Sequence, residues 1–343
     1  MSRFSRSLGI DLGTANVLVY LEGKGVVVRE PSVVAMDRNT GKVLQVGADA
    51  KRMLGRTPGN LVAIRPLRDG VISDYGMTER MIYTFIRRVS RFGLVKPRVV
   101  ICVPSGITEV EERAVIQATM EAGARRVYLM EEPLAAALGA NMDITSANGG
   151  MVVDIGGGTT DIAVLSLGGI VSSSSVKIAG DRFDEAIIRY LRRRFGVLVG
   201  QQTAEEIKIT LGSVMPRPED LEMAAKGRNL RTGLPVDVTI KASDIREALL
   251  PAATEIVEEI RAVLEQTPPE LVTDISRNGI VLSGGGSLLY GMDKLVTERT
   301  HIRCVVADDA EACVAYGLGK SLKWMNTMQE GTLNLARRKL MAD

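Results

Sequence analysis

Two short glycine-rich motifs constrain the fold of this chain more than any other feature. The first is Gly-Ile-Asp-Leu-Gly-Thr at residues 9–14, and the second is Asp-Ile-Gly-Gly-Gly-Thr-Thr-Asp at residues 154–161. Each joins an apolar strand to an aspartate and then to a glycine turn that ends in hydroxyl side chains. Because glycine lets the backbone approach closely and adopt positive φ, such a turn can point several N–H groups at one anion. The pair predicts two duplicated halves that hold one nucleotide from opposite sides.

The aspartates of the two motifs are the first candidate ligand-binding residues. Asp11 and Asp154 each stand at the carboxyl end of a strand, where α/β folds place ligands. A carboxylate needs a counter-charge beside phosphate, so we expect the pair to hold Mg²⁺ through water at the β- and γ-phosphates. The alternative is that each aspartate only stabilises its own turn. The donors expected to face the phosphates are Gly13, Thr14, Ala15, Asn16, Gly156, Gly157, Gly158, Thr159 and Thr160.

A further carboxylate stands where a helix is expected to begin. Residues 131–134 read Glu-Glu-Pro-Leu. Proline suits the first helical position, and a carboxylate just before it faces the positive end of the helix dipole. Glu132 either caps this helix or reaches into the cleft and orients the attacking water. Phosphoryl transfer depends chiefly on positioning and charge neutralisation, so one such carboxylate suffices. The residues alone give both interpretations equal weight.

Two more segments are candidates for contact with the nucleoside. A third glycine turn follows an apolar strand and suits an adenine or ribose that packs against bare backbone; its residues are Gly284, Gly285, Gly286, Ser287 and Leu288. The other segment is helical and contains Glu205, Glu206, Ile207 and Lys208. That helix is either a salt-bridged surface helix or a second contact with the nucleoside.

Composition excludes several classes of function. A net charge of +2 gives no general attraction to nucleic acid, so no nucleic-acid partner is expected. Cys102, Cys304 and Cys313 are widely spaced and predict neither a disulfide framework nor a zinc site, and Cys102 is expected to act as a small buried hydrophobe. The sequence contains no run of about 18 apolar residues. A cytoplasmic protein is expected.

The order of expected elements is the same in both halves. In the first, strands at 8–10, 17–21 and 26–28, with a further strand at 31–35, precede a helix at 77–91, a buried strand at 99–103 and a helix that Thr108 caps. In the second, strands at 151–155, 161–167 and 170–176 precede helices at 181–195 and 244–266, a strand at 279–283 and one helix at 309–324. We predict one domain at 1–145 with an insertion at about 33–65, and another at 146–317 with an insertion at about 181–243. The segment 318–343 is expected to pack back on the first domain.

These motifs resemble those of the actin, sugar-kinase and chaperone ATPase superfamily and, along nearly the whole length, those of the MreB family of bacterial actin homologues. The supporting segments are residues 9–16, 28–35, 103–108 and 154–161. The resemblance implies an actin-like (ribonuclease H-like) α/β fold, with duplicated domains and four subdomains around a nucleotide cleft that binds ATP and Mg²⁺. It also implies that Glu132 and Thr159 orient the attacking water and that residues 205–208 touch the nucleoside. In such a family, monomers stack head-to-tail into paired, membrane-attached filaments that organise cell-wall synthesis and maintain rod shape.

A predicted loop between the helix at 77–91 and the strand at 99–103 is a candidate membrane contact. Phe92, Leu94 and Val95 are bracketed by basic residues, which suits insertion into an anionic membrane surface. The alternative is that these side chains pack onto the sheet, and the family resemblance favours the membrane. The expected partners are further copies of the chain, the inner face of the membrane, and proteins of cell-wall synthesis and morphogenesis.

Other members of the same superfamily provide the rival hypotheses. A small-molecule kinase needs a catalytic aspartate that faces an acceptor hydroxyl, and the sequence offers no obvious candidate. A chaperone-type ATPase would need a substrate-binding domain, and a plasmid-segregation filament would not need an apolar membrane loop. We therefore expect ATP hydrolysis that is coupled to polymerisation rather than to metabolism.

Overall fold

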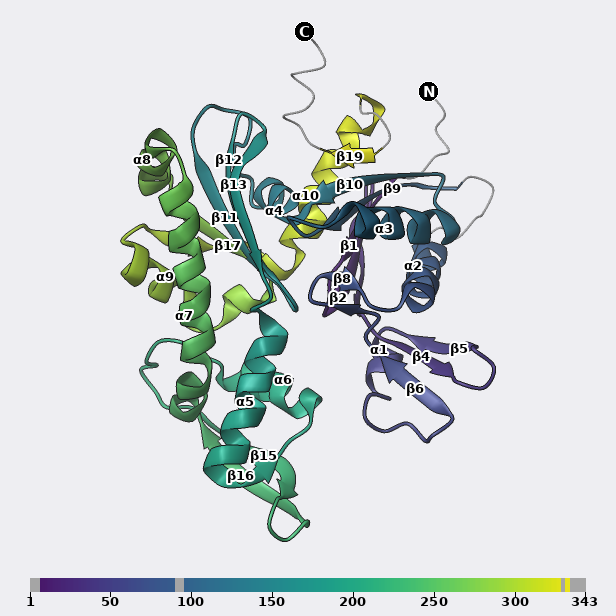
Figure 1. Cartoon of the computed structure of the whole chain (residues 1–343), viewed down its shortest axis with the longest axis vertical. Helices are drawn as coiled ribbons and strands as arrows, with labels where there is room; N and C mark the ends of the chain where they lie inside the picture. Colours follow the sequence, from purple (N-terminus) through teal and green to yellow (C-terminus); the bar gives the residue numbers. More distant parts are fainter. Residues whose placement is uncertain (1–6, 90–95, 328–330, 334–343) are drawn as a thin grey trace.

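Two mixed β-sheets stand side by side and form the two halves of the molecule (Figure 1). The computed structural model describes residues 7–89, 96–327 and 331–333. The order of strands is β19-β10-β9-β1-β2-β3 in the first sheet and β13-β12-β11-β17-β18 in the second. Each sheet is therefore built from an antiparallel three-stranded meander extended by parallel strands, which is the repetition that the two motifs predict.

The first sheet contains the amino-terminal meander. β1 (Ser7–Leu12), β2 (Asn16–Leu21) and β3 (Gly25–Pro31) are antiparallel neighbours, and β1 pairs in parallel with β9 (Arg98–Val103). β10 (Arg126–Glu131) continues the parallel pairing, and β19 (Gly331–Leu333) pairs with β10 at the edge. Strand β9 is buried on both faces, as its continuous apolar run predicts. One face packs with α2 (Tyr75–Val89) and α3 (Glu109–Glu121), and the other with α4 (Glu132–Gly139) and α10 (Cys313–Ser321).

The second sheet repeats this arrangement. β11 (Gly150–Ile155), β12 (Thr160–Ser166) and β13 (Gly169–Val176) form the meander, and β17 (Ile280–Ser283) and β18 (Cys304–Val306) extend it in parallel. The helices of this half are α5 (Gly180–Phe195), α6 (Gln201–Leu211), α7 (Ala242–Gln266), α8 (Pro269–Asn278) and α9 (Met292–Thr300). Their apolar faces and this sheet share one large core.

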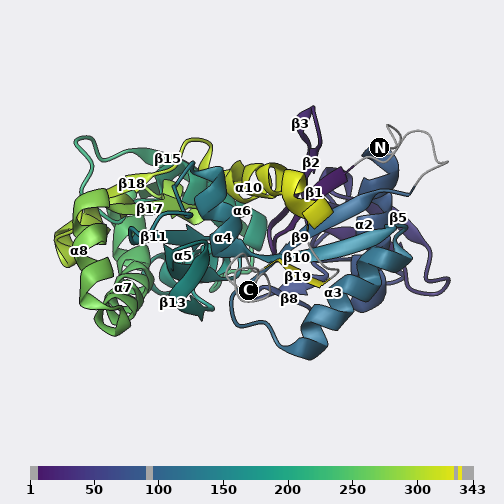
Figure 2. The same cartoon turned by 90° about the horizontal axis from the view of Figure 1, so that it is seen from above.

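Helices α4 and α10 lie between the two halves, as the view from above shows (Figure 2). A Cβ atom on Gly317 would lie 1.8 Å from the carbonyl oxygen of Ala135, and one on Gly139 would lie 1.9 Å from that of Cys313. The two helices therefore touch backbone to backbone, and only glycine permits this approach at both positions.

Each half also carries smaller elements at the lower end of the molecule in the view of Figure 1. In the first half these are β4 (Val34–Asp37), β5 (Val43–Val46), α1 (Ala48–Lys51) and β6 (Leu61–Ile64). β7 (Leu67–Arg68) and β8 (Val71–Ile72) form a separate two-stranded sheet that packs against the core of the first half. In the second half the smaller elements are β14 (Val197–Leu198), β15 (Glu222–Asn229) and β16 (Pro235–Lys241). The domain boundaries and insertion limits given above stay predictions.

Most expected elements are present, and two differ. Thr108 caps α3 in a reciprocal capping box with Glu111, as predicted. The strand expected at 31–35 is interrupted, because Ser32 donates from its backbone and its hydroxyl to the carbonyls of Ala15 and Gly13. The single helix expected at 309–324 is instead η2 (Ala310–Ala312), α10 and η3 (Leu322–Thr327). The Asp309 carbonyl accepts from the Ala312 N–H, which makes the first turn a 3₁₀ turn. None of the described helices is long and apolar enough to cross a membrane.

Candidate functional site

A cavity of about 270 Å³ opens between the two sheets, at the ends of β1 and β11. Both glycine motifs reach it, and so do the amino terminus of α4, the glycine turn after β17 and helix α6. Of the residues predicted from the sequence, those that line it are Asp11, Gly13, Thr14, Ala15, Asn16, Glu132, Asp154, Gly156, Gly157, Gly158, Thr159, Glu205, Lys208, Gly284, Gly285, Gly286 and Leu288. The structure therefore brings segments from both halves of the chain to one site.

The two glycine turns touch each other at the floor of this cavity. A Cβ atom on Gly157 would lie 2.7 Å from the Cβ of Ala15, and one on Gly158 would lie 2.8 Å from the Oγ1 of Thr14. Any side chain at these positions would push the halves apart. Thr14 is held in place by the backbone N–H of Gly70, which donates to its hydroxyl at 3.1 Å. Such paired glycine turns suit an anion held between them.

Asp11 and Asp154 are buried carboxyls that lack a compensating positive charge in their hydrogen bonds. Burial raises the pKa of Asp11 to about 6 and that of Asp154 to about 7, although the Cys102 thiol donates to the first and the Ser283 hydroxyl to the second, at 3.2 and 2.5 Å. The charge of Asp11 raises the pKa of Asp154 further. A divalent cation between them would offset both charges, and carboxylate oxygens are the donors that Mg²⁺ prefers. The donor set therefore fits Mg²⁺.

Glu132 faces this acidic group from the first residue of α4. Burial, together with the charges of Asp161, Asp154 and Asp11, raises its pKa well above the ordinary value. Asp161 is fully buried; its Oδ1 accepts from the Ser105 N–H at 2.9 Å, and its carboxyl shares a hydrogen bond with that of Glu132. The second motif contains Asp161, but the motif alone indicates no functional role for it. The sequence clue was its position, since Asp161 pairs directly with Asp154 across the β11–β12 hairpin.

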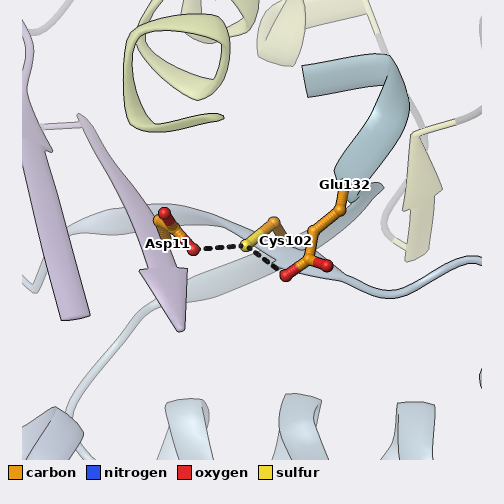
Figure 3. Close-up of side chains that lie close together, drawn as sticks. All are labelled: Asp11, Cys102 and Glu132. Carbon is orange, nitrogen blue, oxygen red and sulfur yellow. Dashed lines mark hydrogen bonds between the residues drawn. The ribbon is translucent and has the colours of Figure 1, made fainter. Parts of the chain in front are cut away.

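Cys102 lies between Asp11 and Glu132 (Figure 3). Its Sγ is 3.2 Å from Oδ1 of Asp11 and 3.8 Å from Oε1 of Glu132. The expectation of a small buried hydrophobe is therefore wrong in part: the side chain is buried, but its thiol contacts two carboxylates. The physical reason is alternation along β9, which turns Val100 and Cys102 toward α4 and α10, on the face opposite α2 and α3.

Helix α6 presents only part of its predicted segment to the cavity. Glu205 and Lys208, three residues apart, share the face that lines it. Ile207 is fully buried in the core, and Glu206 lines a neighbouring groove instead. Lys208 forms a 2.8 Å ion pair with Asp184 and donates to a backbone carbonyl.

Glu205 also forms a link between the two halves of the molecule, beside the neighbouring groove. Its Oε2 lies 2.7 Å from the Nζ of Lys51, in the small elements of the first half. Gln202, one turn earlier in α6, donates to the backbone carbonyl of Lys51. The salt-bridge interpretation of this helix therefore holds for Glu205, whose partner lies in the other half of the molecule.

Two residues of the predicted nucleotide-binding segments have hydroxyls that donate to backbone carbonyls. Ser287 is buried and donates to the carbonyl of Gly284 at 2.6 Å, and Thr160 is buried and donates to that of Ile178 at 2.6 Å. Gly284 itself has φ 78°, and a Cβ there would lie 2.3 Å from the Ile155 carbonyl oxygen. The predicted membrane residues Phe92, Leu94 and Val95 lie outside the described residues.

The sequence patterns indicate no role for some of the residues that line the cavity. Arg217 is the most notable, because its guanidinium stacks 4.5 Å from the ring centroid of Tyr290 and donates to the Gly212 carbonyl. No local sequence pattern marks such a residue, since its position depends on packing between distant segments. The remaining such residues are Leu12, Leu18, Gly70, Gly180, Ile209, Gly212, Leu289, Ala310, Glu311 and Val314.

Comparisons with known proteins agree with this architecture. The family described as MreB/Mbl protein matches residues 5–330. The chain is 53% identical to the cell shape-determining protein MreB of Escherichia coli (strain K12) over 329 residues, which are 94% of this chain and 95% of that protein. It is 50% identical to the cell shape-determining protein Mbl of Bacillus subtilis (strain 168) over 332 residues, which are 96% and 100% of the two chains.

A solved structure, MreB 5 of Spiroplasma citri bound to AMPPNP, superposes with a TM-score of 0.91. Its sequence is 38% identical, and the match covers 95% of this chain and 98% of that one. The fold is thus actin-like, as the sequence motifs predict. Taken together, the family match over nearly the whole length and the identities to its members show that this chain belongs to the MreB/Mbl family.

Proposed function

We propose that this chain is a cytoskeletal ATPase that polymerises into membrane-associated filaments, organises cell-wall synthesis and maintains rod shape. One observation carries the proposal: acidic glycine hairpins from both sheets meet in a single cavity, with Glu132 beside them. The names of its relatives, cell shape-determining proteins MreB and Mbl, support the cellular role. The AMPPNP bound to a relative supports an adenine nucleotide as the ligand.

In this proposal each segment of the cavity has a separate task. Residues 13–16 and 156–159 donate to the phosphates, and the turn at 284–286 packs against the base. Asp11 and Asp154 hold Mg²⁺ through water, and the cation, when bound, neutralises charge on the phosphates. Glu132, together with Thr159, accepts a hydrogen bond from the attacking water and orients it. The high pKa of Glu132 when nucleotide is absent is consistent with a carboxyl that needs such a cation nearby to stay ionised.

Filament and membrane attachment are further parts of the proposal. Head-to-tail stacking in paired filaments would repeat one weak membrane contact along a face, and linked sites can gain about 10²–10⁴ in avidity. Phe92, Leu94 and Val95 are the proposed contact with anionic lipid at the inner face of the membrane. The chain is thus proposed to act in the cytoplasm, at the membrane surface, with proteins of cell-wall synthesis as partners.

Sedimentation with ATP and Mg²⁺, with and without anionic liposomes, tests the proposal. We expect pelleting that depends on ATP, and co-sedimentation with liposomes that the Phe92→Ser, Leu94→Ser double variant loses while it still binds ATP. Glu132→Gln should slow phosphate release by about 10²-fold or more, because it removes the group that orients the water. A soluble chain whose turnover is stimulated by a small acceptor would overturn the proposal and favour a small-molecule kinase.

A further inference from the structure

Three side chains with metal-binding atoms converge beside the proposed Mg²⁺ position. They are Asp11 from β1, Cys102 from β9 and Glu132 from α4, and their nearest carboxylate and thiol atoms all lie within 4.8 Å of one another (Figure 3). Asp11 is 8% exposed and Cys102 is 3% exposed. Asp11 and Glu132 line the cavity, which gives an ion a path to the cluster. The proposed Mg²⁺ position uses only one of these three residues.

The two sulfur–oxygen separations in this cluster are close to those around a tetrahedral zinc ion. Zn²⁺ binds thiolate at about 2.3 Å and carboxylate oxygen at about 2.0–2.2 Å, which at a tetrahedral angle places sulfur and oxygen roughly 3.5 Å apart. The two observed sulfur–oxygen separations, 3.2 and 3.8 Å, lie on either side of that value. Mg²⁺ takes oxygen ligands in octahedral geometry, so the thiol distinguishes this cluster from a magnesium site.

A separate observation concerns Asp161, which lies beside this cluster. Asp161 is 0% exposed, and both its charge and a hydrogen bond between the two carboxyl groups act directly on Glu132. Two buried carboxyl groups side by side are costly unless a proton or a cation lies with them. The lysine that lines the cavity, Lys208, is already paired with Asp184.

We propose that Asp11, Cys102 and Glu132 form a binding site for Zn²⁺, with Asp161 orienting Glu132 from behind. On binding, the thiol of Cys102 and the carboxyl of Glu132 each lose a proton to solvent, a zinc–sulfur bond forms, and oxygens of Asp11 and Glu132 replace water on the ion. The ion then binds the Glu132 carboxylate, which would otherwise orient the attacking water. Zinc therefore inhibits ATP hydrolysis. Only this last consequence rests on the proposed function, because zinc binding itself requires neither nucleotide nor turnover.

The test uses the full chain without nucleotide, with Co²⁺ as a spectroscopic substitute for zinc and equilibrium dialysis of Zn²⁺ itself. We expect one ion per chain and a cobalt–thiolate charge-transfer band in the near ultraviolet. Cys102→Val should abolish the band and weaken zinc binding at least about tenfold, since even outer-shell partners of metal ligands contribute 10–100-fold. Cys304→Ser is the matched control, because Cys304 is a buried cysteine in β18, outside the cavity, and should keep both.

The wild-type spectrum alone can overturn the inference. A wild-type chain that shows no cobalt–thiolate band, or a Cys102→Val variant that dialyses with as much zinc as the wild type, would exclude the site. Glu132→Gln provides a second variant that retains the cysteine: it should keep a weakened band and lose at least about tenfold in zinc affinity. Unchanged affinity in Glu132→Gln would also contradict the proposal. None of these outcomes depends on whether the chain hydrolyses ATP.

Discussion

Replacing Asp154 by asparagine tests whether the ionised carboxylate of Asp154 destabilises the folded chain until a cation binds beside it. Asparagine has nearly the same shape and keeps an oxygen that can accept from the Ser283 hydroxyl. It removes the negative charge, whose burial, near Asp11 and Asp161, raises the pKa of Asp154 from 3.8 to about 7. At about 1.36 kcal/mol per pKa unit, ionising this carboxyl costs roughly 4 kcal/mol more in the folded chain than in the unfolded chain.

The sign of the pH dependence follows from which state holds the proton. Between about pH 4 and pH 7 the folded chain keeps a proton on Asp154 that the unfolded chain has released, so wild-type stability falls as the pH rises through this window and levels off above it. Asp154→Asn lacks this contribution. The free energy of unfolding of the variant should therefore equal that of the wild type near pH 4 and exceed it at pH 8. The difference at pH 8 should be at most roughly 4 kcal/mol.

Thermal unfolding in EDTA, followed by circular dichroism from pH 4 to pH 8, measures this difference. We expect the melting temperature of Asp154→Asn to rise above that of the wild type by several degrees at pH 8, and the gap to close as the pH falls. Mg²⁺ with nucleotide should stabilise the wild type and have much less effect on the variant. A variant that melts at or below the wild-type temperature at every pH would refute the electrostatic argument.

Three further changes test other parts of the structure. Gly157→Ala places a Cβ 2.7 Å from that of Ala15, so nucleotide affinity measured by calorimetry should fall at least about tenfold, whereas Gly59→Ala, which meets open space, should not alter it. Lys51→Met removes the ion pair that joins the two halves at Glu205 and should speed release of a fluorescent nucleotide about 2–5-fold in stopped flow; an unchanged rate would contradict this expectation. Thr108→Ala removes the cap of α3 and should lower the free energy of unfolding in urea by about 0.5–2 kcal/mol, with nucleotide affinity unchanged.

The parts of the fold that could be predicted are those determined by neighbouring residues. The apolar run at 99–103 indicates a strand buried on both faces, and β9 is that strand. Thr108 and Glu111 form a capping box because their spacing alone permits both hydrogen bonds. The glycine motifs likewise specify their own hairpins, since each is complete within eight residues or fewer. Local chemistry was enough in each case.

The contacts that depend on strand order could not be predicted in the same way. Cys102 meets Asp11 only because β9 lies between β1 and β10 in the sheet, and it meets Glu132 because α4 follows β10 directly. Nothing near Cys102 in the sequence marks that pairing. The face of α6 was ambiguous for a similar reason: Glu205 and Ile207 are close in sequence, but only packing decides which one is buried.

The position of Glu132 depends on both halves of the molecule at once. Helix α4 continues from β10 in the first sheet, yet it packs against β11 and β12 of the second, while α10 packs against β1 and β2. Because backbone meets backbone at Gly317 and Gly139, the two helices have no side-chain layer that could absorb a shift between them. A change in the angle between the sheets must therefore move α4 as a rigid body, and Glu132 is its first residue. The geometry that brings the two glycine turns together is thus the same geometry that places the Glu132 carboxylate beside them.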